Sequence, residues 1–287
     1  MSTVRTEAIM GTLVTIRVVR AGADAAVDRA FEWFHEVERR CTRFDPASEL
    51  VQLTARTGIA VPTSTILFEA VRFAIAVAEE TGGAFDPTVG RAMEERGFDR
   101  EHRSGGTVRT SGVHGTWRDV EIDGTNRTIT LHRPVVVDLG AVAKGLAVDA
   151  AVRELEPFED FAIDAGGDLY LGGHNPQGVP WSIGIRHPRN PDELIDTVHV
   201  SDRAVCTSGD YERPGHILDP RTREPASATA SVTVISPSAM SADTLATAAF
   251  VLGPIDGIAL LERIGVQGLI VTPELELIAT EGLRHAA

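Results

Sequence analysis

The sequence predicts a mixed α/β or α+β fold, and three observations lead to this expectation. Segments with helical and with strand periodicity are interleaved along the chain, but without the steady strand-helix-strand alternation of a doubly wound parallel sheet. The second half is richer in predicted strands than the first. The composition is that of an ordinary globular protein, with 43% hydrophobic and 24% charged residues. A chain of 287 residues allows one large domain or two intimate subdomains.

The predicted helices follow from apolar residues that recur on one face. Residues 24–41 place Val27, Phe31, Phe34, Val37 and Cys41 on such a face. Residues 64–80 form a second predicted helix, with Ser64 as N-cap and Gly82-Gly83 at its end. We expect further helices at about 141–155, at about 241–252 from Ser241 onward, and at about 255–264 after Pro254.

The predicted strands follow from β-branched runs and from turn residues. Residues 119–132 indicate a β-hairpin that turns at Asp123-Gly124-Thr125-Asn126. The Gly- and Arg-rich stretch 100–116 reads as a flexible loop. The remaining predicted strands are 12–20, 135–138, 161–164, 181–185, 196–200, 203–207 and 231–236, followed by a hairpin over 268–278 that turns at Pro273-Glu274.

Charge and cysteine content exclude several classes of protein. The formal net charge is −14 and the pI is near 5.1, which disfavours partners such as nucleic acid or an anionic membrane. The sequence shows no apolar leader region, lipid-anchor cysteine or membrane-spanning run, so we expect a soluble cytoplasmic protein if the native N-terminus is present. Cys41 and Cys206 lie in apolar segments, where buried free thiols are expected.

Five segments combine Gly with Asp, Thr, Ser or His at the boundary of a predicted element. Glycine at such junctions lets the backbone approach a ligand closely. The segments are Thr81–Thr88, Val137–Gly145, Asp164–Asp168, Thr207–Tyr211 together with Gly215–Pro220, and Ser241–Thr247. These junctions are the positions where the chemistry of the protein could lie.

Two of these segments carry specific chemistry. A strand that runs through Gly140 into a helix presents free N–H groups to an anion, and Lys144 adds a positive charge. Asp243 and Thr247 lie four residues apart, on one face of a helix, so both oxygens can reach one cation. Oxygen ligands suit Mg²⁺, which keeps water or phosphate in its remaining positions.

Each feature also has a purely structural interpretation. Asp243 lies near the start of its predicted helix and could stabilise that end. Thr247 could be a buried hydroxyl bonded to the carbonyl four residues earlier. The Gly-Gly pairs at 82–83 and 166–167 are typical of turns, and His216 could be a half-buried histidine with satisfied hydrogen bonds.

Taken in order, these segments resemble the ApbE-type family, the FAD:protein FMN transferases. The resemblance covers nearly the whole chain. It begins at Met10-Gly11-Thr12, continues through the Ser48-Glu49-Leu50 segment, and ends in the Ala-Asp-x-x-x-Thr pattern of Ala242 to Thr247. It implies a single domain over residues 1–287, a compact T-fold-like unit of two intimate halves with an FAD cleft between them.

The resemblance also implies an activity and a set of site residues. The reaction is Mg²⁺-dependent transfer of the FMN moiety of FAD to a Ser or Thr hydroxyl of an acceptor flavoprotein, with release of AMP. The metal ligands implied are the Asp243 carboxylate, the Thr247 hydroxyl and the Ala143 carbonyl. His216 and Asp243 are implied as catalytic. The residues implied around FAD are Met10, Asp86, Lys144, Asp168, Ser208 and Gly209.

Three positions depart from the family pattern. Thr54 stands where the family commonly has Asn, Arg91 where Pro is frequent, and Arg223 where Gly is usual. These departures bear on acceptor choice and ligand affinity. Three alternatives stay open: an FAD pyrophosphatase that uses water as acceptor, a flavin carrier without catalysis, and an interaction protein whose Gly-Asp motifs are turns.

Overall fold

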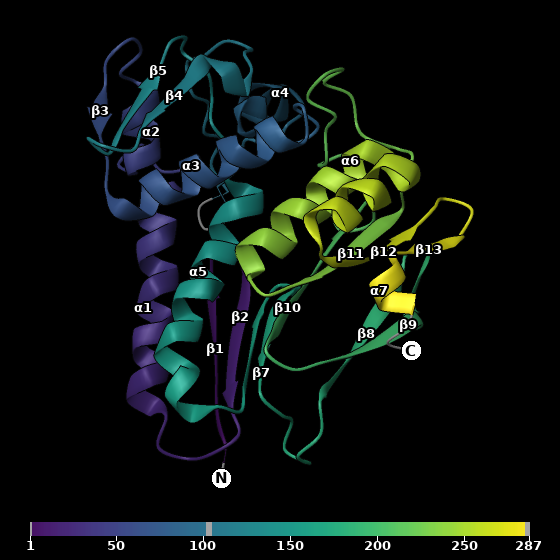
Figure 1. Cartoon of the computed structure of the whole chain (residues 1–287). Coiled ribbons are helices and arrows are strands. Elements are labelled where there is room, and N and C mark those ends of the chain that lie inside the picture. Colours follow the sequence, from purple (N-terminus) through teal and green to yellow (C-terminus); the bar gives the residue numbers. More distant parts are fainter. Residues whose placement is uncertain (1, 102–104, 285–287) are drawn as a thin grey trace. The chain divides into compact units, whose positions relative to one another are not determined.

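A computed structural model describes residues 2–101 and 105–284 (Figure 1). Within that part of the chain, every pair of named strands is antiparallel. The strands form an eight-stranded sheet in the order β1-β2-β6-β7-β10-β11-β12-β13, a three-stranded sheet β3-β5-β4 and a two-stranded sheet β8-β9. The mixed fold class is therefore confirmed, and antiparallel pairing explains the absence of steady strand-helix-strand alternation.

The chain divides into two compact units. The first comprises Met1–His35, Lys144–Ile217 and Ala226–Ala287, and the second comprises Glu36–Ala143 and Leu218–Pro225. Each unit is described by itself below. The single domain expected from the sequence, with its FAD cleft between two halves, stays a prediction.

The first unit is built on the eight-stranded sheet. Its strands are β1 (Thr3–Ile9), β2 (Thr12–Val18), β6 (Phe161–Ala165), β7 (Asp168–Gly172), β10 (Arg203–Gly209), β11 (Ser231–Ser236), β12 (Gln267–Val271) and β13 (Leu277–Ala279), with β8 (Trp181–His187) and β9 (Asn190–Val200) as a separate hairpin. Its helices are the first part of α1 (Asp24–Cys41), most of α5 (Gly140–Leu155) with the short η3 (Glu156–Phe158), α6 (Ala239–Ile264) and α7 (Glu281–Arg284).

Two layers cover this sheet. Helix α6 packs along β10, β11 and β12 (Figure 1), and β11 is buried along its whole length, as expected for a central strand. On the sheet, the β8–β9 hairpin covers an apolar cluster made of Leu171, Ile185, Val198, Val200, Val205, Ile235 and Leu269. Strands β7 and β10 contribute Leu171 and Val205 to this cluster.

Helix α6 is two helical segments joined at a kink. Gly253 has a positive φ of 82° and Pro254 follows it, so the regular hydrogen bonding is interrupted there. The two helices expected from the sequence on either side of this point are confirmed. By length and composition α6 is apolar enough to cross a membrane, but 61% of the relevant window is buried inside the protein, as for a core helix.

The second unit combines short helices with the small sheet. Its elements are the end of α1, α2 (Glu49–Thr54), β3 (Val61–Pro62), α3 (Thr65–Glu80), η1 (Pro87–Val89), α4 (Gly90–Glu95), η2 (Trp117–Asp119), β4 (Val120–Asp123), β5 (Thr128–Leu131) and the start of α5. The bounds of α1 and α3, the Ser64 N-cap and the 119–132 hairpin agree with the sequence-based predictions.

One sequence-based prediction is wrong, and the start of one confirmed helix is shifted. Residues 135–138 do not form a strand: the Val136 carbonyl accepts from Gly90 and the Asp138 N–H donates to Pro87, so this buried segment bonds to a helix start. Its regular pairing is one isolated bridge, Val113 to Val135. Helix α6 begins at Ala239 with Ser238 as its N-cap, two residues before the expected start.

The stretch 100–116 lies partly outside the described residues, at 102–104. Its described part contains isolated bridges, such as Arg100 to Thr107, in place of regular strands. Both cysteines are buried free thiols, as predicted.

Candidate functional site

Two neighbouring hairpin turns form one side of the candidate site in the first unit. Met10 and Gly11 link β1 to β2, and both have positive φ, 53° and 73°. The turn of Gly166 and Gly167 links β6 to β7 beside it, and a Cβ on Gly166 would lie 2.1 Å from the Thr12 hydroxyl. A left-handed Met is uncommon in proteins, and such outliers cluster at functional sites. The Gly-Gly pair is a turn, as one interpretation predicted, and also a point of close approach.

A buried charge cluster lies next to these turns. Lys144 of α5 forms an ion pair and a hydrogen bond with Asp168, the first residue of β7. The Lys144 Nζ also lies 3.7 Å from Oδ2 of Asp243 on α6. Asp168 and Asp243 are 3% and 7% exposed. Three residues that are distant in sequence are therefore brought together by two helices and a strand.

The cluster holds two carboxylates for one ammonium. Burial and, after it, the neighbouring Asp168 carboxylate raise the pKa of Asp243 to about 7, while Lys144 opposes them. Burial alone lowers the pKa of Lys144, but Asp168 and Asp243 together raise it above its usual value, so the ammonium stays charged. Among the described residues, the Asp243 Oδ2 is one of the few buried side-chain atoms that have no hydrogen-bond partner.

That orphaned oxygen is a candidate ligand for a cation. Thr247 follows one helical turn later, and its Oγ1 lies 3.2 Å from Oγ of Ser208 on β10. Because Ser238 caps α6, the alternative that Asp243 caps this helix is wrong. Within residues 2–101 and 105–284, no group of three or more His, Cys, Asp or Glu side chains forms a metal site. A cation at Asp243 therefore depends on hydroxyl, main-chain or ligand oxygens, which suit a hard ion.

The other predicted FAD residues of this unit lie at the same strand ends. Ser208 and Gly209 end β10, and a Cβ on Gly209 would lie 2.6 Å from the Tyr211 ring. Cys206, two residues before Ser208, is wholly buried, and its Sγ donates to the Ala239 carbonyl at 3.7 Å. Burial, followed by Asp168 and Asp243, raises the pKa of this thiol, so it is a packing residue and not a nucleophile.

His216 lies half-buried on the segment that follows β10. Its Nδ1 is 2.6 Å from the Arg213 carbonyl oxygen. Since a carbonyl oxygen can only accept, Nδ1 carries the proton, and Nε2 is left with a lone pair. Burial is the main cause that lowers the pKa of His216. The ring is therefore neutral at pH 7, as a general base must be.

Asp86 lies in the second unit, where its own neighbours occupy it. Its Oδ1 accepts from the N–H and hydroxyl of Thr88 at 2.8 and 2.7 Å, and its Oδ2 accepts from Trp117 N–H at 3.0 Å. Burial nevertheless raises its pKa. Ala143 directly precedes Lys144 but belongs to the second unit. The FAD role of Asp86 and the metal role of Ala143 stay predictions.

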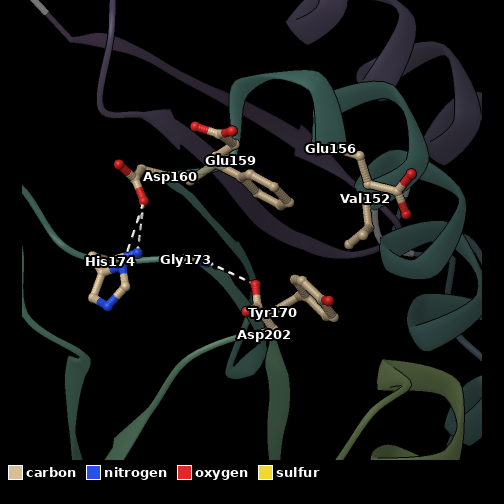
Figure 2. A pocket seen from close by; sticks show the side chains of 9 residues that line it. Val152, Glu156, Glu159, Asp160, Tyr170, Gly173, His174 and Asp202 are labelled. Carbon is tan, nitrogen blue, oxygen red and sulfur yellow. Dashed lines mark hydrogen bonds and ion pairs between the residues drawn. The ribbon is translucent and has the colours of Figure 1, made fainter.

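A separate pocket of about 480 Å³ opens at the other end of β7 (Figure 2). Asp160 and His174 contact each other directly, since the His174 N–H donates to Asp160 Oδ1 at 2.8 Å, and the Gly173 N–H donates to Asp202 at 2.8 Å. None of the predicted site residues lines it. The lining is Val152, Glu156, Glu159, Asp160, Phe161, Tyr170, Gly173, His174 and Asp202. So many carboxylates disfavour a pyrophosphate there.

The sequence contains a signal for this cluster that the sequence-based prediction did not use: its rare lysine. Lys144 is the single lysine among the 27 lysine and arginine residues of the chain. A chain that otherwise uses arginine places its one compact ammonium against two buried carboxylates. Lysine offers a point charge where arginine offers a planar fork.

Comparison with known proteins identifies the class. The family model for the ApbE family matches residues 10–270. An FAD:protein FMN transferase of Treponema pallidum is 31% identical, over 97% of this chain and 87% of that protein. The FAD:protein FMN transferase of Vibrio cholerae is 32% identical, over 91% of this chain and 85% of that protein.

Solved structures agree with this match. The ApbE protein of Thermotoga maritima superposes with a TM-score of 0.89 at 30% identity, covering 100% of this chain and 99% of that one. The flavin transferase ApbE of Vibrio cholerae gives a TM-score of 0.89 at 28% identity, with 100% and 99% coverage. The chain belongs to the ApbE family.

The ion cluster allows a prediction about stability. We expect Lys144→Met to lower the free energy of unfolding by about 3 kcal/mol, because two buried carboxylates lose their counter-charge. Urea denaturation at pH 7 in EDTA measures this. The control is Arg72→Met, which removes an exposed pair with Glu69 on α3 and should change stability by less than about 1 kcal/mol. Equal losses in the two variants would contradict the assignment.

Proposed function

We propose that this protein transfers the FMN moiety of FAD to a Ser or Thr hydroxyl of an acceptor flavoprotein in a Mg²⁺-dependent reaction that releases AMP. Membership of the ApbE family supports flavin transfer. The observation that carries the metal dependence is the orphaned Oδ2 of buried Asp243, beside Lys144 and Asp168. A buried carboxylate oxygen that has no hydrogen-bond partner, and whose nearest cation is the Lys144 ammonium at 3.7 Å, favours an additional positive partner such as a metal ion.

The residues present fit Mg²⁺. Asp243 and Thr247 would hold the ion together with the Ala143 carbonyl, and all three offer oxygen, which this cation prefers. When bound, it would offset negative charge on the pyrophosphate of FAD. The protein itself also supplies positive charge for the pyrophosphate. The Lys144 ammonium, held in place by Asp168, would attract phosphate oxygens as a point charge.

FAD binding is proposed for the strand ends and turns around this cluster. The first unit contains Lys144 together with Met10, Asp168, Ser208 and Gly209. At Gly166 the two turns approach so closely that a side chain would not fit, which leaves the backbone there accessible to a ligand. Asp86 would contribute from the second unit. The left-handed conformation of Met10 supports a role for its turn, since strain of this kind persists where function requires it.

The transfer step follows from His216. The acceptor hydroxyl oxygen attacks the phosphorus on the FMN side of FAD, and its proton passes to Nε2 of His216. The bond between that phosphorus and the bridging oxygen breaks, and AMP leaves with that oxygen. A neutral ring whose Nδ1–H is held by the Arg213 carbonyl keeps Nε2 as the acceptor nitrogen, which is what a general base needs.

For the acceptor protein we propose a class and a cellular setting. The acceptor is a flavoprotein with a Ser or Thr flavinylation site, in a cytoplasmic setting. The net charge of −14 disfavours nucleic acid as a partner.

Product analysis tests this function. We expect incubation with FAD and Mg²⁺ to yield AMP and protein-linked FMN when an acceptor fragment is present, and neither product when EDTA is added. Chromatography of the small molecules measures AMP and free FMN. AMP with an equal amount of free FMN, whatever fragment is offered, would identify a pyrophosphatase. Intact FAD bound without turnover would identify a carrier.

The pH dependence of transfer tests His216. Its pKa lies below the ordinary 6.5, chiefly because of burial. A base works in its neutral form, so the rate should level off above neutral pH and fall as the pH drops through the lowered pKa. Initial rates at saturating FAD and saturating Mg²⁺ measure this profile, since bound Mg²⁺ keeps the proposed ligand Asp243 ionised. A rate that keeps rising steadily above pH 7.5 would contradict His216 as the base.

A further inference from the structure

Helices α5 and α6 touch backbone to backbone next to the charge cluster, within the first unit. A Cβ on Gly145 would lie 2.4 Å from the Cα of Met240, 2.5 Å from its N and 2.6 Å from the carbonyl carbon of Ala239. Gly145 is the residue after Lys144, so the helix carrying the ammonium packs without a side chain against the first turn of α6.

One turn further along α5, Asp149 clasps the same end of α6. Its Oδ1 accepts from the Ala239 N–H at 2.7 Å. Its Oδ2 accepts from the Ser238 hydroxyl at 2.6 Å and from the Met240 N–H at 3.1 Å. Residues 145 and 149 lie on one face of a helix, so the glycine contact and the carboxylate act on the same turn of α6.

This arrangement differs from an ordinary helix cap. Ser238 already caps α6, since its Oγ accepts from the Ser241 N–H at 3.2 Å. Asp149 comes from another helix and bonds to N–H groups that the local cap leaves unsatisfied. The carboxylate also favours the positive end of the α6 dipole. Its three bonds therefore fix the position of α6 relative to α5.

The contact between α5 and α6 sets the distance between Lys144 and Asp243 in the candidate site. Lys144 lies five residues before Asp149 on α5, and Asp243 lies four residues after Ala239 on α6. The Nζ to Oδ2 distance of 3.7 Å between Lys144 and Asp243 thus depends on how these two helices meet. Asp243 directly follows the first turn of α6, so a shift of that turn moves Asp243 with it.

We propose that Asp149 is a positioning residue of this enzyme, which holds the first turn of α6 against α5 so that Asp243 faces both Lys144 and the cation. The inference rests on the proposed function for the cation, but the geometry of the Lys144–Asp243 pair stands without it. Asp149 acts through its bonds to Ser238, Ala239 and Met240, on the helix that carries the proposed metal ligand.

The single lysine makes the test direct. An N-hydroxysuccinimide ester acylates accessible amines, and after digestion at arginines mass spectrometry reports the rate at Lys144 separately from the N-terminus. In metal-free protein, we expect Asp149→Ala to raise the acylation rate at Lys144 about fivefold. Loss of a helix cap costs about 1 kcal/mol, which increases about fivefold the population of molecules in which the first turn of α6 has separated from α5 and Lys144 is accessible. Asp149→Asn keeps one acceptor oxygen and should give an intermediate rate.

A control separates positioning from general stability. Ser64→Ala removes the cap of α3 in the second unit, where Ser64 accepts from Leu67 N–H, and should lower the melting temperature without changing the Lys144 rate. The second readout is Mn²⁺ binding, followed by electron paramagnetic resonance. We expect Asp149→Ala to weaken it about 10-fold, as loss of a group supporting a metal ligand does, and Ser64→Ala to leave it unchanged.

The outcomes separate the two proposals. If wild-type protein binds no Mn²⁺, the metal part of the proposed function is wrong, while the Lys144 rates still decide the positioning role. If folded Asp149→Asn or Asp149→Ala protein shows the wild-type rate at Lys144, the positioning role is wrong. If neither variant folds, Asp149→Glu, which keeps the carboxylate but displaces it by one methylene and leaves the Ser238 cap in place, must raise the rate at Lys144, and a wild-type rate there overturns the proposal.

Discussion

Replacing Asp243 by asparagine is expected to abolish FMN transfer while leaving the protein folded. Asparagine keeps the shape of the side chain but removes the charge that a divalent cation requires. We expect the transfer rate to fall at least about 1000-fold, equivalent to about 4 kcal/mol of lost transition-state stabilisation. Because the Asp243 Oδ2 is buried without a hydrogen-bond partner, removing its charge should not lower the stability of the metal-free protein.

Rates of AMP release under saturating Mg²⁺ and FAD measure this effect, and thermal melts measure folding. Asp256→Asn is a matched control, since it removes an exposed carboxylate from the same helix and should transfer FMN at the wild-type rate. Asp243→Asn with more than a tenth of wild-type activity would contradict the metal assignment.

Replacing His216 by asparagine should slow transfer by about 100- to 10 000-fold, the usual contribution of general acid–base catalysis. Its Nδ1–H bond to Arg213 shows a ring fixed in one tautomer, and asparagine has no basic nitrogen to replace Nε2. If His216 acts as the base and does not hold the phosphates, FAD affinity should change by less than about threefold. A base contributes only to the transition state, so its loss leaves the binding of FAD in the ground state unchanged.

The matched control for this variant is His174→Asn. His174 is exposed in the acidic pocket at the other end of β7 (Figure 2), and its loss should leave transfer unchanged. A His216→Asn variant that transfers normally, or one that loses FAD binding in proportion to its rate, would contradict the role of base.

The elements with strong local signals could be predicted from the sequence. α1 and α3 begin and end where periodicity, Ser64 and Gly82-Gly83 indicate. β1 and β7 were missed, since β1 alternates between exposed and half-buried positions and β7 is only five residues long. Residues 135–138 have the composition of a strand, but tertiary hydrogen bonds to residues 87 and 90 replaced a strand partner.

The candidate site was predictable as far as its chemistry lies in short motifs. Lys144, Asp168 and Asp243 were named from three separate segments, and the fold brings them together. Asp149 could not be assigned a role, because its partners lie about 90 residues away. The orphaned Oδ2 of Asp243 and the tautomer of His216 are properties of packing, which the sequence does not state.

Mass spectrometry of an acceptor fragment tests the central claim most directly. The fragment, from a flavoprotein with a Ser or Thr site, is incubated with FAD, Mg²⁺ and either wild-type protein or Asp243→Asn, then denatured and weighed. We predict one FMN added to a Ser or Thr by the wild-type protein, an equal amount of AMP, and no addition by the variant or in EDTA. Equal addition by the variant, or AMP release without any addition to a fragment that a relative modifies, would contradict the account.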